Sequence, residues 1–333
     1  MSHEITDIDE MFSVRQPTWH GLGQILDDYP SRQEAQQIAH PWEPISEPLY
    51  REVPYFDESG LPQTRYEKVE GYVANSRSDN AHLLGVVSDG YVPINNSEMW
   101  DIAEVLQGEN TDVKFETAGS LAGGRKVWLM LRLEEPIEID GDPNGATVPF
   151  YALQNSHDGS GSFRGQATSL RIVCANTSHA ADMDAKAKGT EFTFRHSKNI
   201  RERVEEARHA LAGWRESVAD WKLLNEHLLT MNVDAEGERE FVTRFIPEPL
   251  TSMTSERVKR NIDEARSEFM GVYRGETLEG VTGTAYGLVH AASEWTEHYR
   301  RARTEETRFK RAVLDRNGVL GDAVKIAREV AFA

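Results

Sequence analysis

The spacing of apolar residues divides the chain into two halves. Up to about residue 198 apolar and polar positions alternate in short runs, as in Lys126–Leu133, which predicts strands. From about residue 199 apolar residues recur every three or four positions, as at Ile200, Val204 and Leu211, which predicts helices. We therefore expect an α+β fold, with an antiparallel β-rich core that contains one inserted helix and is followed by an all-helical C-terminal half.

Local composition suggests three regions. Residues 1–60 contain many Pro, Asp and Glu and few periodic segments, so we expect an acidic, irregular N-terminal arm with one short helix near Ser31–Ile38. Residues 61–198 form the expected β-rich core domain, and residues 199–333 form the expected helical region. Strands are expected at Gly71–Asn75, His82–Ser88, Val113–Ser120, Lys126–Leu133, Val148–Gln154 and Ser169–Asn176.

The inserted helix begins after Ile94, where Asn96 or Ser97 is the expected N-cap. Apolar residues follow at helical spacing, and Gly108 ends the segment. Later helices are expected over residues 199–231, Ser255–Tyr273, Ala285–Arg301 and Thr304–Val330. Pro247 and the glycines at 280 and 283 separate them.

Composition narrows the class of protein. Hydrophobic residues make up 39% and charged residues 28% of the 333 positions, which is ordinary for a globular protein. The longest apolar runs have four or five residues, so we expect no membrane span. The N-terminus is acidic and resembles no signal peptide, and Cys174 is the single cysteine. These features favour a cytoplasmic location, without an internal disulfide.

The net charge of −18 is unevenly distributed. Residues 1–194 carry −17 and residues 195–333 carry −1, which argues against a protein that binds duplex DNA through an overall basic field. Residues 160–204 nevertheless contain eight basic and four acidic residues. Such a strip is either a solvated face or an anion-binding surface.

A nucleic-acid backbone is one ligand for these cations. The candidate binding residues are Arg125, Lys126, Arg164, Arg171, Lys186, Lys188, Arg195 and Lys198, with Phe163 or Phe194 as a platform for a stacked base. Alternation along the strand predicts that Arg171 faces away from the core. The competing interpretation is that these arginines form ion pairs within the acidic chain.

A polar segment over residues 153–166 joins two regions expected to be strands. Its His157 and Asp158 have the chemistry of a general base with its orienting carboxylate, or of two metal ligands. Its glycines could present backbone N–H groups to a phosphate. The alternative is a hairpin loop in which Asn, Ser, Asp and Gly serve turn geometry. We single out Asn155, His157, Asp158 and Asn176 as motif residues.

Two other groups contain potential metal ligands. His179, Asp182 and Asp184 have types that bind divalent cations, but their spacing matches no known metal signature. A second group consists of His290, Glu294 and His298 at four-residue steps, where an ordinary polar helix surface is the simpler interpretation. We assign no metal and no cofactor.

Four motifs together resemble a known family. They are Trp19-His-Gly-Leu-Gly, Asn155-Ser-His-Asp-Gly-Ser, Arg171-Ile-Val-Cys-Ala-Asn-Thr and Thr282-Gly-Thr-Ala-Tyr-Gly followed by Glu297-His298. The chain resembles, from about residue 10 to its C-terminus, the phage/plasmid-like protein family built on the domain of unknown function catalogued as 932. It departs from that family at Val289-His290, where Asn-Ala is usual. The resemblance implies a phage or mobile-element origin and no particular activity.

The expected order of elements also resembles the core of single-strand annealing recombinases of the Rad-fifty-two type. That core has a helix, then antiparallel strands, then another helix. We therefore expect a non-enzymatic, homo-oligomeric protein that binds and anneals single-stranded DNA, with a role in recombination in the host cytoplasm. The alternatives are a phage interaction protein that uses its acidic surface on host or phage partners, and a metal-assisted hydrolase that uses His157 and Asp158.

Cys174 provides a first test of the expected core. Aliphatic residues flank it on an expected strand, so we expect a buried and unreactive thiol. A thiol reagent should label the native protein slowly and the urea-unfolded protein at once, because a core thiol reacts only after an opening event. Equal labelling rates would contradict this expectation.

Overall fold

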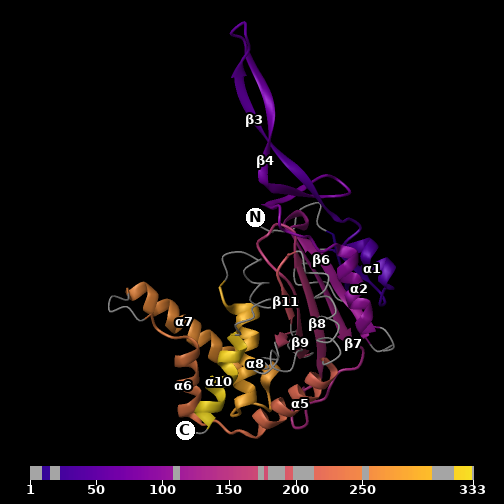
Figure 1. The fold of residues 1–333 in the computed structure, drawn as a ribbon. Helices are drawn as coiled ribbons and strands as arrows, with labels where there is room; N and C mark the ends of the chain where they lie inside the picture. The colour runs from indigo at the N-terminus through magenta and orange to yellow at the C-terminus, as the bar shows by residue number, and fades with distance from the viewer. Residues whose placement is uncertain are drawn as a thin grey trace.

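The computed structural model describes residues 10–15, 23–107, 113–171, 176–178, 192–197, 214–249, 255–301 and 319–331. Within these residues, all named strands precede residue 198, and all named elements after residue 198 are helical (Figure 1). This arrangement confirms the α+β fold expected from the spacing of apolar residues.

The larger sheet has eight strands in the order β10-β9-β8-β7-β6-β1-β2, with β11 also paired to β9. The strands are β1 (Met11–Val14), β2 (Gln24–Leu26), β6 (Val113–Leu121), β7 (Lys126–Leu133), β8 (Thr147–Ser156), β9 (Phe163–Arg171), β10 (Asn176–Ser178) and β11 (Phe192–Phe194). All pairs are antiparallel except β1–β2. The expected strands match β6, β7 and β8 within two residues. The expected fourth strand was wrong at its start, because β9 already begins at Phe163.

Both faces of the large sheet are apolar. On β7, Leu129 and Leu131 pack in one core with residues of α1 (Arg32–Ala39) and α2 (Asn96–Gln107). Trp128 and Met130 alternate with them and belong to a smaller cluster on the opposite face. A shift by one residue would place Trp128 and Met130 in the core that Leu129 and Leu131 fill, so the different side-chain sizes on the two faces favour one register of β7.

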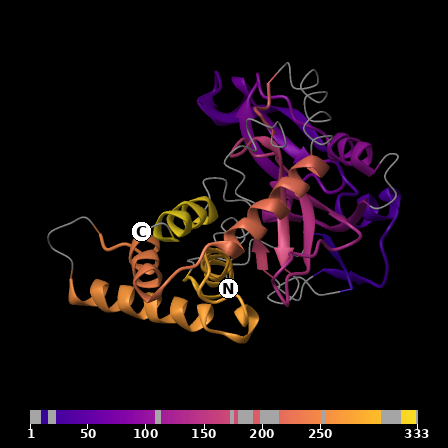
Figure 2. The same cartoon turned by 90° about the horizontal axis from the view of Figure 1, so that it is seen from below.

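The helical half has a core of its own. Its elements are α5 (Trp214–Thr230), α6 (Ala235–Phe245), α7 (Glu256–Tyr273), the 3-10 turn η3 (Glu276–Leu278), α8 (Ala285–Glu294), the π-helical turn η4 (Trp295–Tyr299) and α10 (Val319–Ala331). Seen from below, α5 crosses the sheet while α6, α7 and α10 lie to one side (Figure 2). A buried hydrogen bond of 2.8 Å from the Tyr286 hydroxyl to Asp142 Oδ2 ties α8 to the β7–β8 connection. None of the described helices has the length and apolar character that a membrane span requires.

A second sheet has three strands in the order β3-β4-β5, with β3 (Pro44–Phe56), β4 (Pro62–Arg77) and β5 (Leu83–Ser88). The β4–β5 pairing covers only Tyr72–Ser76 of β4. Residues 50–68 therefore form a two-stranded ribbon that extends away from the body (Figure 1). From here on, the arm means this ribbon and not the N-terminal arm of residues 1–60 that the sequence suggested.

The expected irregular character of residues 1–60 was wrong for the part that the structure describes, residues 10–15 and 23–60. The short helix is confirmed, because α1 follows the capping box formed by Ser31 and Glu34. However, β1, β2 and β3 also lie in this region, and the expected boundary at residue 60 falls in the turn between β3 and β4. Prolines at 44, 48 and 54 made β3 resemble a loop. They are tolerated because β3 is an edge strand and donates fewer hydrogen bonds to the sheet.

The N-terminus of α2 is capped by a residue distant in sequence. The Glu43 carboxylate accepts hydrogen bonds from the backbone N–H of Asn96 at 2.5 Å and of Ser97 at 2.9 Å. The carboxylate also complements the positive end of the helix dipole. Neither Asn96 nor Ser97 is therefore the capping acceptor that local sequence suggested; the Asn96 side chain instead donates to the Trp42 carbonyl at 2.7 Å.

Removing this cap tests its contribution. Glu43→Ala should lower the free energy of unfolding by about 1–2 kcal/mol, because two helix N–H groups lose their acceptor. Urea unfolding measures the change. Glu58→Ala, at the exposed tip of the arm, is the matched control and should change stability by less than about 0.5 kcal/mol. Equal effects would show that Glu43 does not act as a cap.

Candidate nucleic-acid interface

Four candidate cations meet at one end of the large sheet. Arg125 lies in the β6–β7 turn, Lys126 begins β7, Arg164 is the second residue of β9, and Arg195 directly follows β11. The register links them, since Lys126 pairs with Ser156, and Arg164 pairs with both Gln154 and Thr193. Cross-strand partners lie on the same face of a sheet. Three separate segments of the chain thus place positive charge at one end of the large sheet.

These cations differ in exposure. Arg125 and Arg195 are exposed, whereas Lys126 and Arg164 are half-buried. The Arg164 guanidinium donates from Nε and Nη2 to Gln154 Oε1, at 3.1 and 3.0 Å. This two-point contact restricts the orientation of the Arg164 guanidinium.

Of the remaining candidate cations, the structure describes only the backbone of Arg171, which lies away from this group. Arg171 is the last residue of β9, where its backbone pairs with Thr147 and Asn176. Seven positions separate it from Arg164, which corresponds to about 23 Å along a strand. The side chains of Arg171 and Asn176 lie outside the described residues. So do Cys174, His179, Asp182, Asp184, Lys186, Lys188 and Lys198.

The proposed stacking platforms are part of the core. Phe163 is 0% and Phe194 2% exposed. Both pack against Phe192, with ring centroids 5.2 and 4.8 Å away. Alternation places these rings on the face opposite Arg164, so the expectation that Phe163 or Phe194 stacks on a base was wrong.

His157 lies directly after β8 and is fully buried. Its Nε2–H donates to Asn96 Oδ1 at 3.0 Å, and its ring meets the Trp42 ring edge-on at 5.5 Å. Burial is the main cause that lowers the pKa of His157 to about 3, so the ring is neutral at physiological pH. Its hydrogen-bonding partner is therefore the Asn96 amide rather than the carboxylate of Asp158.

Asp158 has a turn-forming role. Its Oδ1 accepts from Ser156 Oγ at 2.6 Å and from the backbone N–H of Ser160 at 2.9 Å. Burial opposes its ionisation, but these hydrogen bonds outweigh burial and lower the pKa of Asp158. The geometry agrees with the hairpin-loop interpretation of this segment. Across the described ranges, no three His, Cys, Asp or Glu side chains gather in a metal-binding arrangement.

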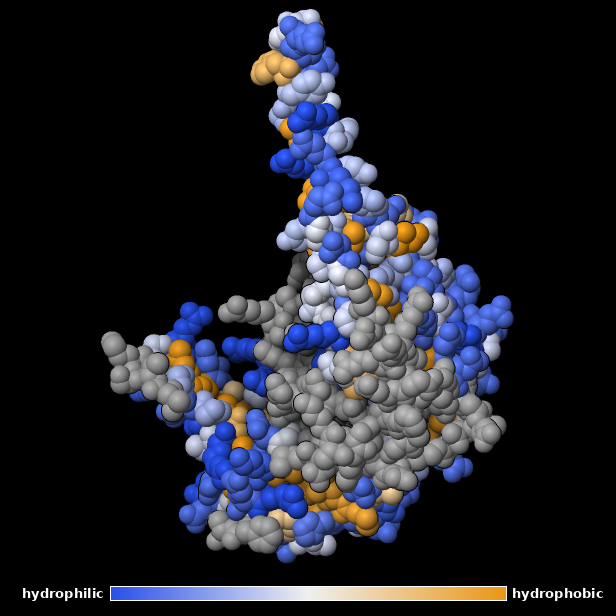
Figure 3. Space-filling view, viewed as in Figure 1, coloured by the Kyte–Doolittle hydropathy of each residue, from blue (hydrophilic) through white to orange (hydrophobic). Residues whose placement is uncertain are grey.

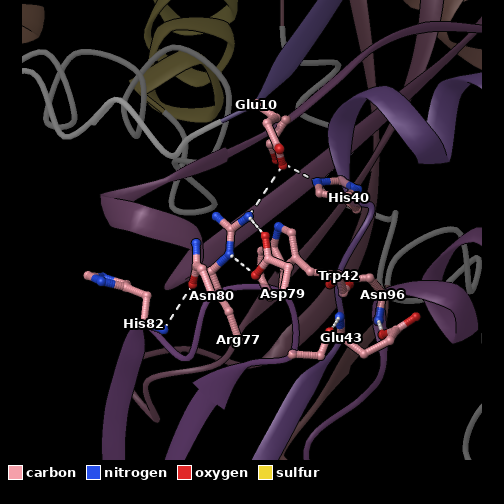
Figure 4. Close-up of polar contacts among 11 residues, drawn as sticks. Glu10, His40, Trp42, Glu43, Arg77, Asp79, Asn80, His82 and Asn96 are labelled. Carbon is pink, nitrogen blue, oxygen red and sulfur yellow. Dashed lines mark hydrogen bonds and ion pairs between the residues drawn. The ribbon is translucent and has the colours of Figure 1, made fainter.

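A group of buried polar side chains holds this end of the sheet together. We call His40, Trp42, Arg77, Asn96 and His157 the polar joint, part of which is drawn in Figure 4. Asn96 is its centre, because its amide bonds both the Trp42 carbonyl and the His157 ring. The joint thereby connects the start of α2 to the segment before β3 and to the end of β8.

Arg77 attaches the second sheet to the joint. Its side chain is 1% exposed, and its Nε and Nη2 donate to Asp79 at 3.0 and 2.7 Å. A second carboxylate, Glu10, lies 3.4 Å from Nη2. The guanidinium also lies over the Trp42 ring, 4.4 Å from the centroid (Figure 4).

His40 completes the joint from the end of α1. Its Nδ1 accepts from Trp100 Nε1 at 3.1 Å, and its Nε2–H donates to the Gly119 carbonyl at 2.8 Å. Burial is the main cause that lowers the pKa of His40 to about 4. Sequence reasoning singled out His157 but missed His40, Trp42, Arg77 and Asn96 as its neighbours, because no local pattern connects them.

The segment before α2 is bonded to the same strand end. Asn155 Nδ2 donates to the Ile94 carbonyl at 3.0 Å, and the Tyr91 hydroxyl donates to the Ser156 carbonyl. Tyr91 also stacks on His196 at 4.5 Å. The motif residue Asn155 is therefore explained by its contact with the backbone.

The expectation that His290, Glu294 and His298 form an ordinary polar helix surface was wrong for the first two residues, whereas His298, in η4, is exposed. His290 and Glu294 are buried, at 1% and 8% exposure. His290 Nε2–H donates to Asn225 Oδ1 at 3.4 Å, and Glu294 accepts from Thr277 Oγ1 at 2.8 Å. These side chains join α8 to α5 and η3.

Comparison with known proteins identifies the family. The sequence model of the family described as "Domain of unknown function (DUF932)" matches residues 83–315. Because this match covers more than half of the chain, the protein belongs to that family. The matched range begins later than residue 10, where the resemblance by motifs begins, and it does not include the arm. No curated protein and no solved structure matches.

The two buried histidines of the joint predict a steep dependence of stability on pH. In the unfolded chain they titrate near pH 6.5, whereas in the folded protein they stay neutral down to about pH 4 for His40 and about pH 3 for His157. Between these limits the unfolded chain binds more protons, so stability is highest above pH 6.5 and falls on acidification. Each histidine should contribute about 1.4 kcal/mol per pH unit.

Urea unfolding at several pH values tests this slope. His157→Gln, which keeps a donor for Asn96, should reduce the slope between about pH 6 and pH 5 by about 1.4 kcal/mol per unit. His298→Gln, which changes an exposed histidine outside the joint, is the matched control. An unchanged slope in His157→Gln would contradict the neutral buried state.

Proposed function

We propose that this member of the DUF932 family binds single-stranded nucleic acid without catalysing a reaction, with the strand lying across the end of the large sheet. In this proposal it is an annealing protein of a phage or related mobile element, and it acts in recombination in the cytoplasm of the host cell. The resemblance to phage and plasmid proteins and the element order of single-strand annealing recombinases support this class.

One observation carries the proposal. Arg125 and Lys126, Arg164, and Arg195 come from three separate segments and lie at the same end of the sheet, which gives a polyanion several contacts at once. A nucleic-acid backbone supplies negative charge at regular intervals, and each phosphate contact releases counterions. Two of the four cations are exposed, and Arg164 is held in place by Gln154.

In the part of the chain that the structure describes, three carboxylates near this end of the sheet have hydrogen-bond or ion-pair partners. Glu10 and Asp79 pair with Arg77, and Asp158 accepts hydrogen bonds within its own loop. They therefore repel a phosphate less than free carboxylates would. The net charge of −18 opposes binding to a duplex over a wide surface. A single strand that contacts only this end of the sheet avoids most of that repulsion.

The two alternatives rest on weaker grounds. A metal-assisted hydrolase based on His157 would need a ring that is accessible, whereas His157 is fully buried and bonded to Asn96. An interaction protein that uses its acidic surface would leave nucleic acid unbound. Both alternatives give distinct results in the binding experiment below.

Fluorescence anisotropy with a labelled oligothymidine over a range of salt concentrations tests the proposal. Arg125→Ala and Arg195→Ala should each weaken binding on all sequences alike and flatten the salt slope by about 0.7 per lost contact. Arg260→Ala, an exposed arginine on α7, removes the same charge far along the chain and should have no such effect. All three should melt at the wild-type temperature, because exposed ion pairs contribute little to stability.

Three results would overturn the proposal. Absence of binding at low salt would favour the interaction protein. If Arg260→Ala weakened oligothymidine binding equally, the loss of binding would reflect only the change in net charge and not a contact at the sheet end. Magnesium-dependent degradation of the oligonucleotide would favour the hydrolase.

A further inference from the structure

The arm has two chemically different faces. Cross-strand pairing places Arg51 opposite Glu67, Val53 opposite Arg65 and Tyr55 opposite Gln63 on one face. Here Glu67 accepts from Arg51 at 2.7 Å and from Arg65 at 2.6 Å. Arg65 also lies 5.8 Å from the Tyr55 ring centroid. This face satisfies its own charges.

The other face is aromatic and uncovered. Register places Tyr50 opposite Lys68, Tyr66 opposite Glu52 and Phe56 opposite Pro62. The exposed fractions are 56% for Tyr50, 73% for Tyr66 and 75% for Phe56. We call these three residues the aromatic face. In Figure 3 the ribbon stands clear of the body, and a few apolar groups are exposed along its mostly hydrophilic surface. Rings so exposed on a thin ribbon indicate a surface that another molecule covers.

A second apolar patch lies where the arm joins the body. Ile45 and Leu83 both pair with Ser76, and Val86 pairs with Ala74, two positions along β4. Tyr72 lies two positions further along β4, so all four side chains belong to one face of the three-stranded sheet. Between 44% and 53% of each is exposed. We call Ile45, Tyr72, Leu83 and Val86 the base patch. The exposed Glu47, which pairs with Ala74, lies on the same face.

The charge of the arm favours a protein partner over nucleic acid. Residues 50–68 contain four acidic and three basic side chains, a net charge of −1. Each of the three cations is paired, since Arg51 and Arg65 bond Glu67, and Lys68 lies 3.4 Å from Glu70. A ribbon that bound phosphates would present unpaired cations instead.

We propose that the arm of one copy packs with its aromatic face on the base patch of a second copy, in a reciprocal exchange about a two-fold axis. Such an interface is self-complementary when each chain carries both the inserted and the receiving surface, as this chain does. The nearly neutral arm also lets two chains of charge −18 meet where their repulsion is smallest.

The area of the contact favours reciprocal exchange. Seven residues of strand extend about 23 Å, and a two-stranded ribbon is roughly 10 Å wide, so one arm covers roughly 250 Å² of its partner. One arm on one patch then buries roughly 500 Å² in total, which is within the range of incidental contacts. Two reciprocal contacts bury roughly 1,000 Å², the lower bound for a specific interface.

Sedimentation velocity of the full chain over a range of concentrations tests the exchange. The wild type should form a dimer, and the double variant Phe56→Ser/Tyr66→Ser should dimerise about 100-fold more weakly or more, because buried aromatic residues dominate interfaces. Tyr55→Ser is the matched control, since it removes a ring from the self-satisfied face and should leave the dimer intact. All variants should keep the wild-type melting temperature of the monomer.

Mixing two variants identifies the receiving surface. Val86→Glu should also weaken the dimer, because it replaces an apolar side chain of the base patch by a second carboxylate in the row that contains Glu47. A mixture of Val86→Glu with Phe56→Ser/Tyr66→Ser keeps one intact arm and one intact patch in the heterodimer. It should therefore associate more tightly than either variant alone.

Four outcomes would overturn the exchange. They are a monomeric wild type at every concentration, a dimer unaffected by loss of the two rings, equal weakening by Tyr55→Ser, and no recovery in the mixture, which would indicate contact between the two arms instead. Loss of oligothymidine binding in the arm variants with the dimer intact would assign the aromatic face to nucleic acid. The charge variants at the sheet end test the proposed function separately, because they leave the arm unchanged.

Discussion

The hydrogen bonds of the Asn96 amide fix the relative position of the two sheets. One end of the amide donates to the Trp42 carbonyl and the other accepts from His157, all without access to water. A buried polar group that loses its partner costs about 1–3 kcal/mol, so few alternative arrangements of these segments keep both ends of the Asn96 amide hydrogen-bonded. The polar joint therefore specifies one geometry, which hydrophobic packing alone specifies less strictly.

Two surfaces depend on that geometry. The β8–β9 loop emerges from the joint toward Arg164, and the β6–β7 turn carrying Arg125 bonds the loop through the His157 N–H at 2.8 Å. On the other side, Asn75 of β4 donates to the His157 carbonyl at 2.9 Å, and Arg77 anchors the same strand. The polar joint thus positions both the cations at the end of the large sheet and the base of the arm. The two proposals about these surfaces are nevertheless independent.

Sequence patterns predicted the elements whose stability is local. The two-residue period of β6, β7 and β8 and the capping box of α1 are each contained in a short segment. Sequence patterns failed for elements whose structure depends on residues that are distant in sequence. The prolines of β3 resemble a loop until the strand is known to lie at an edge, and the cap of α2 comes from Glu43, which no local motif connects to Asn96.

The candidate site shows the same division. The cluster of polar residues at 155–158 was recognised as unusual, yet a His-Asp pair has the same appearance in sequence whether it is catalytic or structural. Burial distinguishes the two cases, and it depends on the Trp42 ring and Asn96 from other elements. Likewise, only the register of β9 and β11 shows that Phe163 faces the core while Arg164 faces outward.

Native-state hydrogen exchange at single residues tests the role of the joint most directly. The N–H groups of Asn96 and Ser97 bond Glu43, and that of His157 bonds the Arg125 carbonyl. If the joint holds the two sheets together, these amides exchange only through the global unfolding that exposes Leu129 and Leu153 in the core, and all five report the same free energy of opening. Exchange of the joint amides at a clearly lower free energy than the two core leucines would contradict the account.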